Sequence, residues 1–318
     1  MKSFVIGESA EYVASCLELA ILLEVSAYPK PGNIHRTADF EETKYEHFLA
    51  SAIAAAPFFR FAAEQGIKVS EGRISCEEVG IGNIIREAVA NISAWQKGGN
   101  TLLGSIILLS PIAVAAGIVL NEHTFSIARL RKELKSVTEA STPKDALAVF
   151  DAIKAAEPAG LGKVSKLDVN DPASRKRIQD DPVTLYEVFK IASTYDSIAS
   201  EWVNNYPVTF DLGYPYFTRQ LKSVGDMNIA TVHTFLKILS RVPDTLIARK
   251  TGLAEARSVS CEAKQVLVNG GLTTLSGKNR LRNFDKKLRD PRHTLNPGTT
   301  ADLLQAVLGI VLLEGYRP

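Results

Sequence analysis

Three short glycine-containing segments carry the strongest chemical signal in this sequence. They are Tyr28–Asn33, Gly98–Thr101 and Asn296–Thr300, and each interrupts or opens an apolar helical stretch. A glycine just before a helix lets backbone N–H groups face outward, where the positive end of the helix dipole favours an anion such as phosphate. We therefore predict that the three segments form one phosphate site. The contributing residues would be Gly32, Asn33, Asn100, Thr101, Asn296, Gly298, Thr299 and Thr300.

Carboxylates are the second signal, because phosphate chemistry usually needs Mg²⁺, which prefers one or two carboxylates together with substrate oxygens. Structural uses compete with this one: an Asp in the first turn of a helix favours the helix dipole, and an Asp in a loop suits a turn. Residue types alone leave open which carboxylate is catalytic and which binds metal. The candidates are Asp39, Asp168, Asp171, Asp196, Glu201 and Asp302.

Two further residue types complete the candidate site. His35 follows Gly32 at a predicted helix break, where it is either a general base or a structural residue. The basic residues Lys30, Arg249 and Lys250 are candidate contacts for a polyphosphate, with ordinary surface charge as the alternative.

Composition excludes several classes of protein. With 37 Lys and Arg against 35 Asp and Glu, the net charge of +2 creates no global field that would gather nucleic acid or an anionic membrane. The 46% of hydrophobic residues predicts a globular core rather than disorder. Three isolated cysteines favour a reducing cytoplasm over a disulfide framework. The five histidines lack metal-ligand spacing, which argues against zinc.

One segment raises the question of a membrane. Thr101–Asn121 contains no charge and is about as long as a membrane-spanning helix. It also contains Gly104, Pro111 and Gly117, and its neighbours are amphipathic, so we favour a central helix that other helices bury on all sides. The start of the chain leads into a charged amphipathic helix rather than a signal peptide. We predict a cytoplasmic protein without a membrane partner.

The elements that must position these residues are helical. Apolar residues recur at helical spacing and strand alternation is hard to find, which predicts an all-α fold of about ten helices around the apolar central one. We expect helices over Glu8–Ala27, from Ser75 to about Gln96, from Thr142, from Asp181 through Tyr195 to about Asn204, over Val224–Ser240, over Leu253–Val268 and from Thr299 or Thr300 to Glu314. Glu157–Asp181 and Thr209–Thr218 are expected to be loops. We predict a single domain over residues 1–318, and the oligomeric state stays open, with a homodimer as one alternative.

These motifs resemble a known family. Pro29–Gly32, Phe48–Ala52, Gly99–Thr101 with Gly104, and Pro297–Leu304 are similar, in this order, to the signature segments of the triphosphoribosyl-dephospho-CoA synthase family. The resemblance spans nearly the whole chain. It implies an all-α fold and a reaction in which ATP loses adenine while its triphosphoribosyl unit passes to a ribose hydroxyl of 3′-dephospho-CoA.

The implied reaction breaks an N-glycosidic bond through an oxocarbenium-like state. One carboxylate can stabilise that state while a second carboxylate or a histidine deprotonates the attacking hydroxyl. By type, the residues that fit these catalytic roles are Asp39, Asp196, Glu201 and His35, and those that fit Mg²⁺ are Asp168, Asp171 and Asp302. The triphosphate would be held by Mg²⁺, by Lys30, Arg249 or Lys250, and by the helix N-termini at Asn100–Thr101 and Gly298–Thr300.

The chain departs from the family pattern at two places. Better-known members read Gly-x-Asn-Thr-His-Lys-Gly where this chain has Leu102 and Leu103 instead of the His-Lys pair, and Thr299 and Thr300 replace a glycine and a serine. The sequence more closely resembles a divergent branch of the family. Two alternatives therefore stay open: another nucleotide or phosphate-ester enzyme of cofactor biosynthesis on the same scaffold, and a non-catalytic nucleotide-binding protein.

Overall fold

Helices account for all the regular elements of the part of the chain that the computed structural model describes, residues 6–121, 125–162, 164 and 166–318. No strand occurs in these residues, so the predicted all-α class is confirmed. They form α1 (Ile6–Ser26), α2 (Tyr45–Ser70), α3 (Ile81–Trp95), α4 (Leu103–Asn121), α5 (Ile127–Glu139), α6 (Pro143–Ala156), α7 (Pro172–Asp180), α8 (Leu185–Ala192), α9 (Ser197–Val203), α10 (Tyr214–Val224), α11 (Met227–Leu239), α12 (Thr245–Thr251), α13 (Leu253–Val268), α14 (Leu275–Leu288) and α15 (Gly298–Leu313), with a 3₁₀ turn at Cys76–Val79 and a π turn at Val208–Gly213.

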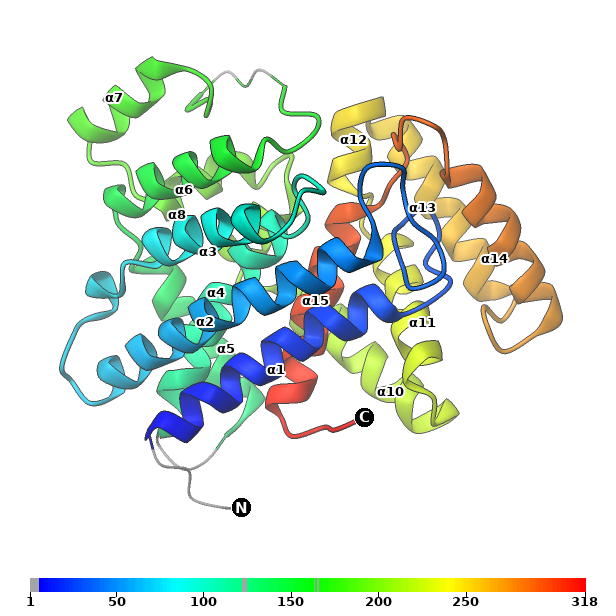
Figure 1. Cartoon of the computed structure of the whole chain (residues 1–318), viewed down its shortest axis with the longest axis horizontal. Coiled ribbons are helices and arrows are strands. Elements are labelled where there is room, and N and C mark those ends of the chain that lie inside the picture. The colour runs from blue at the N-terminus through cyan, green and yellow to red at the C-terminus, as the bar shows by residue number, and fades with distance from the viewer. Residues whose placement is uncertain (1–5, 122–124, 163, 165) are drawn as a thin grey trace.

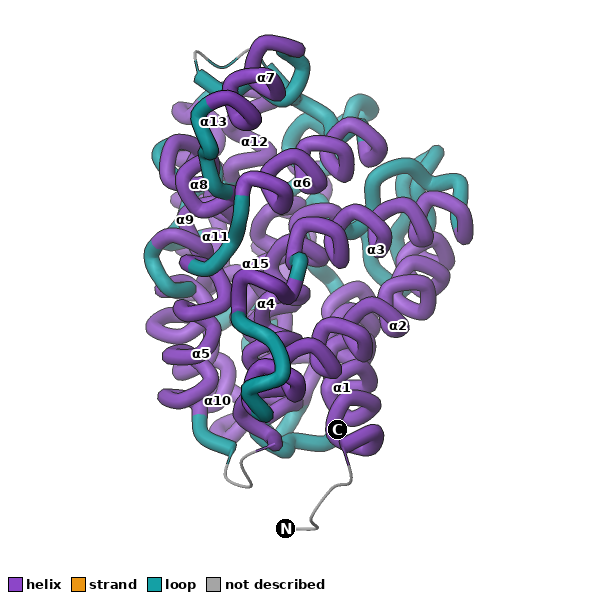
Figure 2. Tube along the Cα trace, turned by 90° about the vertical axis from the view of Figure 1, so that its left-hand side faces the viewer, coloured by secondary structure: helices purple, strands orange, loops and turns teal. Residues whose placement is uncertain are grey.

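Two apolar helices, α4 and α15, form the centre of the fold. Figure 1 shows α15 between the group that holds α3, α6, α7 and α8 and the group that holds α10 to α14, with α1 across its front. The tube view in Figure 2 shows α4 and α15 enclosed by the other helices. Helix α4 is long and apolar enough to span a membrane, but 89% of its most apolar window is buried inside the protein. The predicted central helix is therefore confirmed, and it is covered by protein.

Several predicted helix boundaries are confirmed, because local capping chemistry fixed them. The Thr142 hydroxyl accepts a hydrogen bond from the Asp145 backbone N–H, and the Asp145 carboxylate accepts one from the Thr142 backbone N–H, which starts α6 with Pro143 at its first position. Helix α13 has the predicted bounds, Leu253–Val268. Buried apolar residues from Ala10 to Leu313 form one continuous cluster.

The predicted count of about ten helices was too low, because caps and glycines divide stretches that look continuous. Gly80, at φ 66°, separates the 3₁₀ turn opened by Ser75 from α3. The helix expected from Asp181 to about Asn204 is wrong: Asp181 ends α7, Thr184 caps α8 and Asp196 caps α9.

Both predicted loops contain helix. The stretch Glu157–Asp181 includes α7, which Asp171 caps and Pro172 opens. The stretch Thr209–Thr218 is helical throughout, as the π turn followed by α10. Aromatic and glycine content suggested a loop there, but Pro215 sits in the first turn of α10, where proline is compatible with a helix.

Candidate active site

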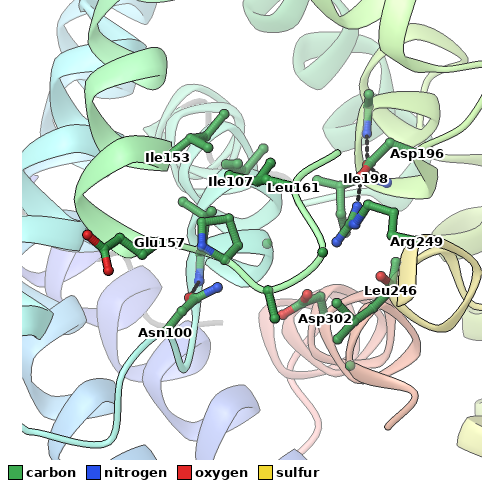
Figure 3. A pocket seen from close by; sticks show the side chains of 18 of the residues that line it. Asn100, Ile107, Ile153, Glu157, Leu161, Asp196, Ile198, Leu246, Arg249 and Asp302 are labelled. Atoms are coloured by element: carbon green, nitrogen blue, oxygen red, sulfur yellow. Dashed lines mark hydrogen bonds and ion pairs between the residues drawn. The ribbon is translucent and has the colours of Figure 1, made fainter. Parts of the chain in front are cut away.

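A cavity of about 630 Å³ opens where the three glycine segments meet. Asn33 of the first segment, Gly98, Asn100 and Thr101 of the second, and Asn296, Gly298 and Thr299 of the third all line it. The predicted convergence of the three segments is therefore confirmed. Figure 3 shows the stretch that carries Glu157 and Leu161 passing between Asn100 on one side and Asp196 and Arg249 on the other.

Eleven of the predicted site residues line this cavity. They are Asn33, Asn100, Thr101, Asp168, Asp196, Arg249, Lys250, Asn296, Gly298, Thr299 and Asp302. The opposite part of the wall is apolar and comes from α4, α6, α8 and α9, with Ile107, Ile153, Val188, Phe189 and Ile198. The cavity thus has a charged half and an apolar half.

The charged half has an acidic floor between α1 and α15. Glu24 is 1% exposed and forms an ion pair with Lys30, which is also fully buried. Gln305 Nε2 donates to Glu24 Oε2 at 3.1 Å. Burial raises the pKa of Asp302 to about 8; the carboxylates of Glu24 and Asp244 add to this rise, and a hydrogen bond from Ser105 opposes it.

Helix α4 approaches this floor through Gly104. A Cβ atom at position 104 would lie 2.2 Å from Asp302 Oδ2, so only glycine lets the carboxyl group of Asp302 lie against the first turn of α4. The next residue, Ser105, donates its hydroxyl to Asp302 Oδ1. Gly104, just after the second segment, therefore positions Asp302, just after the third.

A cationic rim faces the floor from α12 and the loop before α15. Arg249 Nη1 lies 2.5 Å from Asp196 Oδ2, the ion pair drawn in Figure 3. Asp196 also accepts from the Ile198 and Ala199 backbone N–H groups, so it caps α9. Lys250 Nζ donates to the His293 carbonyl at 2.9 Å, and burial lowers the pKa of Lys250.

Helix N-termini contribute to the site unequally. Asn100 Oδ1 accepts from the Leu103 backbone N–H at 3.1 Å and so begins α4 at the edge of the cavity. At α15, the protein already supplies an anion: Asp244 Oδ2 accepts from the backbone N–H of Thr300 at 2.7 Å and from its hydroxyl at 2.8 Å. Asp244 Oδ1 caps α12 by accepting from Leu246 and Ile247.

Three residues in or just after the first segment, Lys30, Gly32 and His35, lie outside the lining of the cavity. Lys30 is taken up by Glu24, and the Gly32 backbone N–H donates to Asp285 Oδ1 at 2.9 Å. His35 Nε2 lies 3.2 Å from Arg289 Nη2. Burial and the nearby cations of Arg289, Lys30 and Arg36 lower the pKa of His35 to about 3. None of the three is among the described residues that line the cavity.

Four other candidates also lie outside the described cavity wall. Asp39 is exposed and accepts from the Tyr45 backbone N–H, the first residue of α2. Asp171 caps α7, and Thr300 is bound to Asp244. Glu201 is 1% exposed and accepts from Val208 N, Thr209 N and the Thr209 hydroxyl, which joins α9 to the π turn. Burial raises the pKa of Glu201 to about 7.

Sequence reasoning missed Glu24, Gln305 and Asp244. A usable signal existed for the first two: Glu24 occupies a position on the apolar face of α1, and Gln305 interrupts an otherwise apolar helix. A polar residue at a core-facing position needs a partner, which indicates a site. Asp244 precedes α12 in the N-cap position, but sequence gives no sign that its second oxygen reaches α15.

The described residues contain no group of three or more His, Cys, Asp or Glu side chains that could hold a metal ion by themselves. Two amide oxygens that belong to cavity-lining residues, Asn296 Oδ1 and Gln305 Oε1, are buried without a hydrogen-bond partner in this part of the chain. These oxygens are free to accept from a ligand.

The fold and the cavity define an all-α protein with a site suited to a phosphorylated small molecule. The sequence pattern of the ATP:dephospho-CoA triphosphoribosyl transferase family matches residues 10–318, so the chain belongs to this family. The resemblance noted in the motifs is thereby confirmed.

Individual relatives agree with this assignment. The chain is 26% identical over 310 residues to a protein of Pseudomonas fluorescens named as a probable 2-(5''-triphosphoribosyl)-3'-dephosphocoenzyme-A synthase, which covers 96% of this chain and 92% of that one. It is 40% identical over 90 residues to the 2-(5''-triphosphoribosyl)-3'-dephosphocoenzyme-A synthase of Klebsiella pneumoniae, or 28% of this chain and 29% of that one. A crystal structure from Archaeoglobus fulgidus, named as a candidate triphosphoribosyl-dephospho-CoA synthase, shares the fold with a TM-score of 0.61 at 23% identity, over 85% of this chain and all of that one.

Proposed function

We propose that this protein transfers the triphosphoribosyl group of ATP to 3′-dephospho-CoA or a related acceptor and releases adenine. One observation carries the proposal: the three family segments line a single cavity that also holds carboxylates and cations. In this reaction the bond from the ribose C1′ of ATP to adenine breaks and a bond from C1′ to the acceptor oxygen forms. The acceptor hydroxyl loses its proton, and the departing adenine gains one.

The cationic rim supports a role in binding the triphosphate. Arg249 and Lys250 lie on the last turn of α12 and line the cavity, as does Arg292. The N-terminus of α4, opened by Asn100, adds outward-facing backbone N–H groups and the positive end of a helix dipole. We assign less of the phosphate binding to the N-terminus of α15, because Asp244 already accepts from Thr300 there.

Asp196 is the carboxylate that we assign to proton transfer. Its Oδ1 is held by the α9 backbone, and its Oδ2 pairs with Arg249 in the ligand-free protein. A triphosphate that binds Arg249 would exchange this ion pair, which leaves Oδ2 free to accept the proton of the attacking hydroxyl. Arg249 thus couples donor binding to activation of the acceptor.

Mg²⁺ is part of this proposal, because it neutralises a triphosphate and needs few protein ligands. Of the predicted metal residues, Asp302 fits best: it lines the cavity and lies on α15 one turn before Gln305, whose amide oxygen has no partner among the described residues. Asp168 accepts from the backbone N–H groups of Val164 and Asn170, and Asp171 caps α7. Bound Mg²⁺ would supply charge neutralisation of the triphosphate. We also propose that the enzyme is cytoplasmic.

The test is release of adenine. Purified protein is incubated with ATP, Mg²⁺ and 3′-dephospho-CoA, and free adenine and the nucleotide product are measured by mass spectrometry, with each component omitted in turn. We expect adenine only with the acceptor present, and a product that gains the mass of the triphosphoribosyl unit. Asp196→Asn should abolish release, whereas Asp226→Asn, at the exposed cap of α11, should not.

The omission controls separate the alternatives. Adenine release that needs another acceptor would indicate a different substrate on the same scaffold. ATP binding without any adenine release would indicate a nucleotide-binding protein and would refute the proposed reaction.

A further inference from the structure

The acidic floor of the cavity contains an acceptor that the protein leaves unused. Gln305 is 1% exposed, and its Nε2 donates to Glu24 Oε2. Its Oε1 is buried without a hydrogen-bond partner among the described residues. A buried carbonyl oxygen without a partner is unfavourable, and a ligand that supplies a positive charge or a hydrogen-bond donor would satisfy it.

The orientation of this amide is fixed from behind. Glu24 is held by the ion pair with Lys30, and Lys30 is enclosed in the core. Because Glu24 Oε2 accepts from the amide nitrogen of Gln305, the amide oxygen faces away from Glu24. Such support of a ligand by a second group is what keeps metal sites in geometry.

Asp302 lies three residues before Gln305 on α15, so both side chains occupy the same helix face. Asp302 accepts from Ser105 through Oδ1, and its Oδ2 lies against Gly104. In the described part of the chain, no lysine or arginine forms an ion pair with Asp302. A negative charge on this carboxyl group therefore has no cation of the protein beside it.

We propose that Asp302 and the Oε1 atom of Gln305 hold a divalent cation of the Mg²⁺ type, with Glu24 and Lys30 orienting Gln305. Hard cations take oxygen ligands, and Mg²⁺ commonly binds one or two protein oxygens and completes its octahedron with water and phosphate oxygens. The site opens to the cavity, where the triphosphate of the donor would supply the remaining ligands. The use of the cation rests on the proposed function, but the existence of the site does not.

Mn²⁺ is the probe, since its unbound form is counted directly by electron paramagnetic resonance. Wild-type protein without ATP or acceptor should bind one Mn²⁺ per chain, and Mg²⁺ should displace it. Asp302→Asn and Gln305→Met should each weaken binding by about tenfold or more, because the first removes the negative charge and the second removes the amide oxygen. Asp226→Asn removes a surface carboxylate and should bind like the wild type. Unchanged affinity in both site variants would overturn the proposal.

Two further measurements distinguish a missing cation site from misfolding of the variants. In crystals of the wild type soaked in Mn²⁺, anomalous scattering should locate the ion between Asp302 and Gln305, and an ion elsewhere overturns the proposal. If Gln305→Met raises the KM for ATP but leaves Mn²⁺ binding intact, Gln305 recognises the nucleotide and the cation site is refuted. Mn²⁺ binding without adenine release would leave the site standing while the proposed reaction fails. Adenine release by a protein that binds no Mn²⁺ would do the reverse.

Discussion

Substitution of Asp244, a buried polar residue near the site, should strongly lower the free energy of unfolding. Its carboxylate joins two helices: Oδ1 accepts from Leu246 and Ile247 in α12, and Oδ2 accepts from the backbone and hydroxyl of Thr300 in α15. Asp244→Ala removes an N-cap, at about 1 kcal/mol. It also leaves the buried N–H of Thr300 without a partner, at about 1–3 kcal/mol. We expect a total loss of about 2–4 kcal/mol in the free energy of unfolding.

The matched control for Asp244→Ala is Asp226→Ala. Asp226 also caps a helix, but it is exposed, and among the described residues its carboxylate accepts from the Ile229 backbone N–H alone. That variant should lose about 1 kcal/mol. Urea unfolding followed by far-ultraviolet circular dichroism measures both losses. Equal losses for the two variants would refute the idea that Asp244 stabilises the junction of α12 and α15.

Three other outcomes follow from the same geometry. The pKa of Glu201 is raised from 4.5 to about 7, so the free energy of unfolding should fall by about 3 kcal/mol as pH rises between these two values. Glu201→Gln should remove this pH dependence when urea unfolding is measured across the same range. Ser105→Ala removes a hydrogen bond that lowers the pKa of Asp302, so that pKa should rise above about 8 when followed by NMR in cation-free protein. Arg249→Gln should raise the KM for ATP about tenfold, because it removes the proposed phosphate contact. The melting temperature should change little, because Asp196 still caps α9. An unchanged KM would contradict the assigned contact.

Local chemistry made much of the fold predictable. The capping residue Thr142 with Pro143 behind it and the apolar run of α4 are short-range signals, and they gave the all-α class, the start of α6 and the central helix. The division of Asp181–Asn204 into two helices was not predictable in the same way, because Asp181, Thr184 and Asp196 are all competent caps and only packing selects among them.

Residues of the candidate site were predictable where a sequence motif lies at the start of a helix. Asn100, Asn296 and Gly298 were found because a glycine or a cap must stand where a helix begins beside a ligand. The catalytic carboxylates were harder to predict, because an Asp that stabilises a helix start and an Asp that takes part in chemistry look alike in sequence. Asp39 accepts from the first residue of α2 and Asp171 caps α7, and both lie outside the described cavity wall. Their distance from the cavity depends on tertiary contacts that spacing does not encode.

The replacement of the family's His-Lys pair by Leu102 and Leu103 changes the surroundings of Asp302. Leu102 is 1% exposed and belongs to the core, whereas Leu103 lines the cavity next to Gly104, against which Asp302 lies. A leucine at position 103 supplies no charge there, and no lysine or arginine in the described part of the chain forms an ion pair with Asp302. Because burial raises the pKa of Asp302 to about 8, its carboxyl group is largely protonated at neutral pH, and a positive charge that comes with a ligand would favour the ionised form. In the proposed reaction, a divalent cation that arrives with the triphosphate would supply this charge in a branch of the family without the His-Lys pair.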